Sequence, residues 1–318
     1  MPRAQGARAQ MALGFETVYG MPPAANSFWK MPFASTNLGS DQPLLNSELL
    51  GYGRDPLPPV KDAITADGDV AVPLDPRFLA IWFKALMGDP TTTGASAPYS
   101  HEFQTGGWTL PSMSVEVGHP EVPLYSMVSG VVANSITWNM QRSGLVTATV
   151  ACVAQGETDA TSSSAGTLEE LDLTRFGSFN GAIKREGSLL ANVVSGSVTY
   201  TNNLDRVETI RADGKIDGAD PSVAALTGEI VVRFADTVLR DQAEAGDPCE
   251  LEFSYVKDAA NSMTLTAHAV YLPRPRKTVE GPGGVQATYA WQAALDPITG
   301  RMASVTIVND MADLNNPT

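Results

Sequence analysis

Histidine and serine are the first side chains to consider for catalysis or metal binding in this sequence. His101, His119 and His268 are the three histidines, and none lies in the His-Glu-x-x-His spacing that puts two imidazoles on one helical face for zinc. Each is interpreted as a strand-end or loop residue. Ser27 and Lys30 fit the Ser-x-x-Lys pattern of acylating serine enzymes, but the companion Ser-Asp-Asn and Lys-Thr-Gly motifs are missing. We therefore expect no catalytic nucleophile or base.

Acidic and glycine-rich segments offer two further kinds of site. Residues 213–220 carry several aspartates, yet they lack the regular ligand spacing and the final glutamate of a calcium-binding loop. Asp67 and Asp69 lie in turn-like sequence without an aromatic cleft to raise a pKa, which predicts solvated carboxylates. Residues 281–284 are glycine-rich, but no helix pattern follows to hold a phosphate. The sequence predicts no catalytic residue, no cofactor and no metal site, and we expect that the protein is not an enzyme.

The elements that would position any site follow the same order twice. Residues 68–73 and 228–233 are apolar strand patterns that start 160 residues apart, and each precedes an aspartate, Asp75 or Asp236, that can cap a helix. Each helix pattern ends in Gly-Asp-Pro, where proline cannot continue a helix. Period-two strand patterns come next in both copies. We predict a duplicated, mainly β domain with short helices; chance similarity is the alternative, because the match needs insertions between its blocks.

The predicted organisation follows from this repeat and from the composition between its copies. A Ser-, Thr-, Gly- and Ala-rich stretch separates the copies, and a long Gly- and Pro-containing stretch precedes the first helix; such long excursions are usually functional or disordered. In an assembly the second stretch would dock on a neighbour. We expect a flexible arm over 1–12, a first domain over 13–158 with a docking loop over about 37–67, a linker over 156–166 and a second domain over 167–318.

The two expected helices differ in their side chains. The first is apolar nearly all round and contains Phe78, Trp82 and Phe83, whereas Arg240 and Glu244 make the second amphipathic. A helix that is apolar on all sides must be covered on all sides. The cover could be the long loop of the first copy, the second copy, or another subunit. Phe78, Trp82 and Phe83 are therefore candidates for docking between subunits.

The charge of the chain disfavours tight binding to nucleic-acid backbones. The formal net charge is −14, whereas binding to phosphates needs clustered lysine and arginine to displace counterions. Arg274, Arg276 and Lys277 form the one basic cluster in the sequence. In an acidic protein this cluster is a candidate for docking on the acidic surface of a neighbouring copy, and a solvated hairpin tip is the alternative.

Two features bear on the environment of the chain. The longest aromatic and aliphatic run, 78–83, is stopped by Lys84 and is far too short to span a bilayer, so we expect no membrane contact. Cys152 and Cys249 are far apart in the sequence and have no metal-ligand spacing. Reduced, partly buried thiols are the expected state.

Several segments together resemble the major tail tube proteins of tailed bacteriophages. The resemblance is strongest over residues 60–160. It rests on 67–79, 87–94, 98–103, 110–112, 115–120 and 144–150. It implies a β-sandwich with a flanking helix, and hence two tandem tail-tube-like β-sandwich domains in this chain. It also implies subunits that self-assemble into rings, stacked into a hollow tube that conducts DNA during ejection.

The resemblance has further implications for assembly. Rings in this family contain six tube domains, so two domains per chain would give a trimeric ring with pseudo-sixfold symmetry; six chains with an elaborated second domain are the alternative. The implied partners are other copies of the chain and the tape measure, tail terminator and distal tail proteins, and DNA passes without specific binding. The implied location is the virion tail, with assembly in the host cytoplasm.

Glutamates on the polar faces of the predicted strands are candidates for the lumen. Glu116, Glu250 and Glu252 would supply negative charge that repels DNA phosphates, and a solvated outer face is the alternative. A competing function is a virion-surface β-sandwich that binds carbohydrate or a receptor. That function would need an exposed aromatic platform, whereas Trp108, Trp138 and Trp291 lie in or beside strand patterns that predict burial.

Overall fold

The computed structural model describes residues 3–276 and 283–317. Strands make up 47% of the chain and helices 8%, so the predicted mainly β class is confirmed. The longer helices are α1 (Pro76–Met87) and α2 (Val238–Ala245), one in each half of the chain. No helix in the described part of the chain is long and apolar enough to cross a membrane.

Both halves repeat one order of antiparallel strand pairing. In the first half, each of the following strands pairs with the next: β1 (Gln10–Phe15), β10 (Met113–His119), β11 (Leu124–Gln141), β12 (Thr147–Ala154) and β7 (Thr65–Pro73). The second half has the same order in β14 (Gly181–Arg185), β20 (Cys249–Asp258), β21 (Asn261–Tyr271), β22 (Gln286–Ala294) and β19 (Ala225–Arg233). The helix follows β7 in one half and β19 in the other, which supports the predicted duplication.

The two halves share one sheet and one core. Strand β16 (Val193–Thr201) pairs with β11 through seven opposed residue pairs, from Ser135 with Thr201 to Gln141 with Ser195. Strand β23 (Ala303–Asn309) pairs with β9 (Tyr99–Gln104) of the first half. The hydrophobic core is continuous from Met11 to Leu314. The halves are therefore not packed as separate domains.

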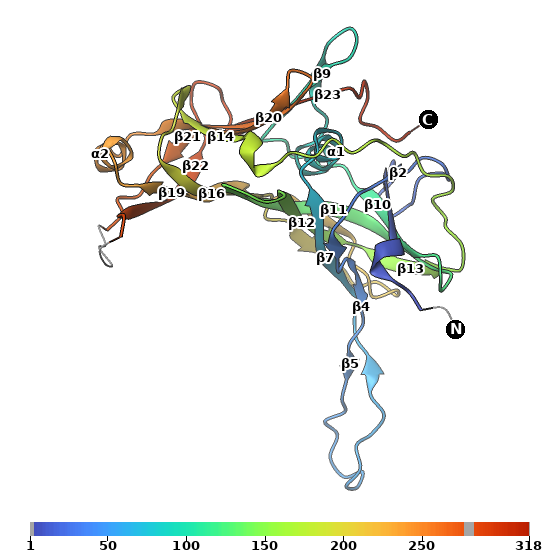
Figure 1. Ribbon diagram of the computed structural model, residues 1–318. Helices are drawn as coiled ribbons and strands as arrows, with labels where there is room; N and C mark the ends of the chain where they lie inside the picture. The colour runs from blue at the N-terminus through green and yellow to red at the C-terminus, as the bar shows by residue number, and fades with distance from the viewer. Residues whose placement is uncertain (1–2, 277–282, 318) are drawn as a thin grey trace.

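We call the sheet that crosses from one half to the other the junction sheet. Its strand order is β3 (Ser35–Thr36) with β4 (Gly39–Asp41), then β7, β12, the C-terminal part of β11, β16, β19 and β22. A second layer packs on it: Phe253 of β20 stacks on Trp291 of β22 with ring centroids 5.2 Å apart. Figure 1 shows the junction sheet running from β7 to β22 below the strands of the second layer.

Helix α1 begins and ends as predicted, but its cover lies within the chain. The Asp75 carboxylate caps the backbone N–H of Arg77 at 2.9 Å, and Pro76 occupies the first turn. The helix contacts β11 and β9 of the first half and β21 and β23 of the second. Phe78, Trp82 and Phe83 are at most 2% exposed. The prediction that these three residues dock between subunits is therefore wrong, since the second half of the same chain already covers them.

The predicted boundaries also change. Strand β1 begins at Gln10, and Met11 and Ala12 are buried, so the N-terminal arm is shorter than 1–12. Residues 156–166 are not a free linker, because β13 (Gly156–Ala160) pairs with β11 and Ala165 is fully buried. Residues 42–62, which we call the arm, form a long hairpin with β5 (Leu44–Leu45) and β6 (Val60–Lys61) paired, and it projects far from the body (Figure 1).

The remaining short elements connect these layers. They are η1 (Gly6–Arg8), β2 (Trp29–Lys30), β8 (Thr91–Thr93), η2 (Ser178–Asn180), β15 (Ser188–Leu189), β17 (Asp205–Val207) and β18 (Gly218–Asp220). Strand β2 pairs with β1, β8 with β9, β15 with β14, and β17 with β18.

Candidate assembly surfaces

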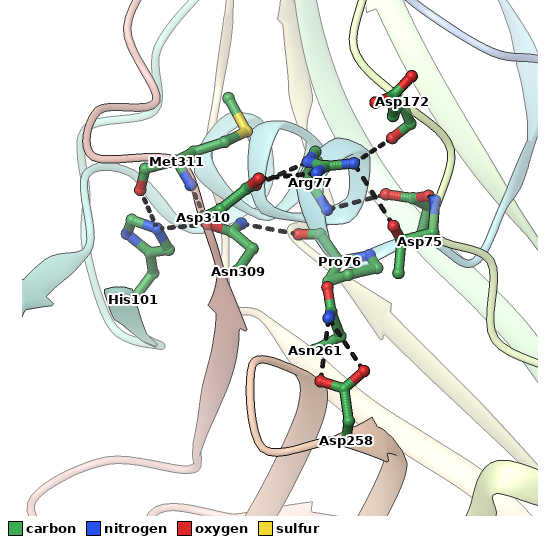
Figure 2. A network of polar contacts seen from close by, with 11 residues as sticks. Asp75, Pro76, Arg77, His101, Asp172, Asp258, Asn261, Asn309, Asp310 and Met311 are labelled. Carbon is green, nitrogen blue, oxygen red and sulfur yellow. Dashed lines mark hydrogen bonds and ion pairs between the residues drawn. The ribbon is translucent and has the colours of Figure 1, made fainter. Parts of the chain in front are cut away.

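A polar network at the start of α1 fixes the second half against the first (Figure 2). The Arg77 guanidinium donates to both carboxylate oxygens of Asp310, at 2.6 and 2.7 Å. This contact holds the pKa of Asp310 below its usual value. Asn309 Nδ2 donates to the Pro76 carbonyl at 3.0 Å. These contacts join the start of α1, in the first half, to the end of β23 and the residue that follows it, in the second half.

His101 and Asp75 complete this network from buried positions. His101 Nε2 lies 3.1 Å from Asn309 Oδ1 and 3.0 Å from the Met311 carbonyl oxygen, and two acceptors at one nitrogen require that Nε2 carries the proton. Burial lowers the pKa of His101. Burial also raises the pKa of Asp75, while backbone N–H groups of Arg77 and Thr174 bind its carboxylate and oppose that shift. His101 and Asp75 thus join the start of α1 to residues that lie far from it in the sequence.

The outward face of the junction sheet is a broad surface of small polar side chains. On β11, β12, β16 and β22, buried residues alternate with partly or fully exposed polar ones over most of the strand, because alternate residues point to opposite faces. The outward residues include Thr147, Thr149, Ser135, Thr137, Asn139, Ser197, Thr199, Thr227, Thr288 and Gln292. Thr137 Oγ1 and Thr199 Oγ1 lie 3.0 Å apart across the boundary between the halves. The polar surface is therefore continuous from one half to the other.

Charges on this polar face are few and mostly negative. Asp67 and Asp69 lie on β7, and Glu229 and Arg233 lie on β19, where Glu229 corresponds to Asp69 in the 160-residue spacing of the halves. Asp67 forms an ion pair with Arg206, whose side chain comes from β17. Sequence reasoning predicted lumen candidates on the polar faces of alternating strands, but it named glutamates of other strands and did not single out the strand over 195–201. The available signal was the strict alternation of Ser or Thr with apolar residues over 195–201, which places every hydroxyl on one side.

The predicted lumen glutamates lie elsewhere in the fold. Glu116 is 4% exposed, and its carboxylate accepts hydrogen bonds from Ser163 Oγ (2.5 Å) and the Ser164 backbone N–H (2.7 Å). The expectation that Glu116 lies on an open strand face is therefore wrong, because it anchors residues 163–165 to β10. Glu250 and Glu252 lie on β20 in the second layer, and Lys184 pairs with Glu252 at 2.7 Å. None of the three is on the junction sheet.

The arm exposes apolar side chains far from the core. Each of the following is at least half exposed: Leu44, Leu45, Leu49, Leu50, Tyr52 and Val60. Leu50 is 93% exposed. Exposed apolar side chains gathered in one segment are typical of a place where another molecule binds. The arm lies within the loop predicted over about 37–67, and its docking on a neighbouring copy stays a prediction.

The predicted basic cluster lies at the far end of the junction sheet from the arm. The Arg274 side chain is 64% exposed, and its Nε lies 3.3 Å from Glu244 Oε1 of α2. Arg276 is also exposed and borders an apolar cavity of about 240 Å³ between α2 and β22. Lys277 lies outside the described residues. The two described arginines can therefore reach a neighbouring molecule.

Other sites considered from the sequence are closed or incomplete. Arg211 forms ion pairs with Asp213 (2.9 Å) and Asp217 (2.6 Å), so a guanidinium occupies the segment that resembled a calcium loop. Within residues 3–276 and 283–317, no group of three or more His, Cys, Asp or Glu side chains could hold a metal ion. Cys152 and Cys249 are buried free thiols, and burial raises the pKa of Cys152 to about 12.

Two of the three tryptophans considered for a sugar-binding platform lie in the core. Trp138 and Trp291 are buried, as predicted, at 1% and 2% exposure. Trp108 is 74% exposed, so the prediction that it is buried is wrong; it follows Gly106 and Gly107 in a loop outside the strands. Of these three tryptophans, Trp108 alone therefore presents its ring to solvent.

Comparison with known proteins identifies the family of the chain. No curated protein matches the chain. A family profile described as phage tail tube protein matches residues 6–293, which span nearly the whole chain and both halves. The β-rich fold is consistent with that match. The chain therefore belongs to the phage tail tube protein family and is a structural subunit of a phage tail.

Proposed function

We propose that three copies of this chain close into one ring of the tail tube, with each half of the chain acting as one tube domain. The junction sheet is the observation that carries this proposal. It crosses from the first half to the second through β11 and β16, which supports treating the two halves as successive units of a ring. Repeating the same step between chains gives a closed ring when the rotations sum to a full turn.

The polar face of the junction sheet lines the lumen in this proposal. Short hydroxyl and amide side chains hold no positive charge for phosphates, and Asp69 and Glu229 add negative charge at equivalent places in the two halves. DNA would then pass without adhering during ejection. Glu250 and Glu252 would face outward, because they alternate with Leu251 and Phe253, which point into the core.

The arm stacks one ring on the next in this proposal. Its leucines are exposed in the single chain and would be buried against another copy, which favours association by about 25 cal/mol per Å² of apolar surface removed from water. A head-to-tail contact of this kind does not close, so it extends into a tube. Ends of the tube would meet tape measure, terminator and distal tail proteins, after assembly in the host cytoplasm.

Negative-stain microscopy with mass measurement tests the ring. We expect hollow rings or tubes, and native mass spectrometry of single rings should give three chains. Six chains per ring would overturn the trimer and leave the tube intact. Monomers at high protein concentration, with no rings or tubes, would overturn the proposed assembly.

Charge reversal tests the lumen. Phage carrying Asp69→Lys with Glu229→Lys should form normal tubes by microscopy but deliver DNA poorly, because cations on the wall hold phosphates. Phage carrying Glu250→Lys with Glu252→Lys form the matched control, with the same change of charge on the second layer. If the control pair impairs delivery and the first pair does not, the lumen assignment is reversed.

A further inference from the structure

The outer edge of the first half has an exact counterpart inside the chain. Strand β7 pairs with β3 and β4, and β19 pairs with β16. Adding 160 to both residue numbers of any opposed pair in the first set gives an opposed pair between β16 and β19. Asp41 with Thr65, for example, corresponds to Thr201 with Ala225. Strand β4 thus occupies the position of β16 in register, residue for residue.

Strands β4 and β16 differ in what lies beside them on the edge that faces away from β7 and β19. Strand β16 pairs there with β11, with Thr201 opposite Ser135 and Thr199 opposite Thr137. Beside β4 lies instead a side chain of β13: Glu157 Oε2 accepts from the Ser40 backbone N–H at 2.7 Å and from Ser40 Oγ at 3.0 Å. Within the chain, the place that corresponds to β11 is therefore held by a carboxylate.

The counterpart of that β11 segment lies at the opposite end of the junction sheet. In the second half, Tyr271 of β21 opposes Gln292 of β22, and in the first half Val132 of β11 opposes Val153 of β12. On their other sides, Gln292 and Val153 oppose residues of β19 and β7 whose numbers differ by 160, so Tyr271 corresponds to Val132. Counting onward from Tyr271 and Val132 puts Arg274 at the place of Ser135 and Arg276 at that of Thr137. Residues 271–276 do run along β22, because they line two cavities together with residues 285–292.

We propose that β4 of one chain lies against residues 274–276 of a neighbouring copy of the same chain, in the register that joins β16 to β11 within the chain. Asp41 then lies opposite Arg274, and Gly39 lies opposite Arg276. This inference rests on the proposed ring and specifies which residues close it. Each end of the junction sheet meets the other end of the next copy.

The charges of the two edges are complementary. Asp41 is exposed and Glu157 is half-buried beside it on one edge, while Arg274 and Arg276 are exposed on the other. Directly opposed unlike charges stabilise antiparallel strands, and like charges destabilise them. Two copies that met through identical edges would place acid on acid or base on base. The charge pattern therefore favours head-to-tail closure.

The backbone contributes little at the centre of this contact. Pro275 falls opposite Ser40, and proline has no N–H to donate. The N–H of Ser40 is already bound to Glu157. Proline and charged side chains on an edge strand limit pairing with arbitrary strands. The contact is therefore carried by the side-chain charges, which makes it specific for the matching edge.

Disulfide trapping in assembled tubes tests the register. The variant Asp41→Cys with Arg274→Cys is oxidised and run on non-reducing gels, and Glu48→Cys with Arg274→Cys is the matched control, with an exposed acidic residue of the arm replaced. We expect cross-linking between chains about tenfold above the control, because a disulfide needs Cα atoms within roughly 7 Å. The native thiols, Cys152 and Cys249, are buried and do not compete.

The outcomes separate this inference from the proposed function. Rings by microscopy with cross-linking no higher than the control overturn the register and leave the tube function intact. Absence of rings in the unmodified protein overturns the proposed function itself. If the cysteine variant does not assemble, charge exchange decides: Asp41→Arg and Arg274→Asp should each reduce ring yield, and the double exchange should restore it. Failure of the double exchange to restore assembly overturns the contact.

Discussion

Replacing Phe83 by alanine should destabilise the isolated chain and not merely its assembly. Phe83 is fully buried, with its ring centroid 6.1 Å from that of Phe103 on β9 and 6.4 Å from that of Trp138 on β11. Removing a buried phenylalanine costs about 3–5 kcal/mol, through lost transfer free energy and the cavity that remains. The cost is paid by the single chain, because its own strands form the surroundings of the ring.

The assay is guanidinium unfolding of chains shown to be monomeric by size-exclusion chromatography, followed by tryptophan fluorescence and far-UV circular dichroism. With an m-value on the order of 4–6 kcal/mol per M for a chain of this size, the midpoint should fall by roughly 0.5–1 M. Phe179→Ala is the matched control: Phe179 is 86% exposed, and its replacement should change stability by no more than about 0.5 kcal/mol.

One result would refute the reasoning. If Phe83→Ala leaves the midpoint within about 0.1 M of the unmodified chain, a shift far below that of a lost core ring, the side chain is not part of the core. If the variant loses ring formation while its unfolding midpoint is unchanged, Phe83 lies at a contact between subunits.

Three further predictions follow from the same contacts. Residues 1–166 alone should show no cooperative thermal transition by circular dichroism, because β21 and β23, which cover α1, are lost; a transition like that of the full chain would contradict the shared core. Deleting residues 46–56 should change the stability of the isolated chain by less than about 0.5 kcal/mol, since the arm is exposed, yet prevent ring stacking in micrographs; normal tubes would exclude the arm as the stacking element. Burial lowers the pKa of His101 from 6.5, so the folded chain binds fewer protons than the unfolded chain, and stability should fall as pH drops below about 6.5, by at most about 1.4 kcal/mol per pH unit for this group. His101→Gln should show a smaller loss of melting temperature between pH 7.5 and 5.5, and an equal loss would assign the pH dependence to other groups.

Local signals in the sequence specified the elements and their repetition. Asp75 and Pro76 set the start of α1, and Gly-Asp-Pro sets its end, because capping and proline geometry depend only on neighbouring residues. Strand alternation and the spacing of 160 residues between the halves likewise needed no tertiary information. The same signals predicted the mainly β class and a tail tube resemblance, and both are confirmed.

The assembly surfaces could not be predicted from those signals alone. Alternation divides a strand into two faces but does not say what lies against the polar one, so Glu116 was taken for a wall residue although residues 163–165 cover it. The Ser and Thr faces of β11 and β12 join that of β16 in one surface only because β16, which lies far from them in the sequence, pairs with β11.

The cover of α1 shows the same division between local and distant information. A helix pattern that is apolar on every side predicts that other segments cover the helix on every side, because its side chains must be buried. Which segment supplies the cover depends on contacts between residues more than 170 positions apart, because α1 contacts β21 and β23 of the second half. The local sequence thus determines the elements and their repeated order. The shared core, the polar face and the two complementary edges depend on contacts that form only in the folded chain.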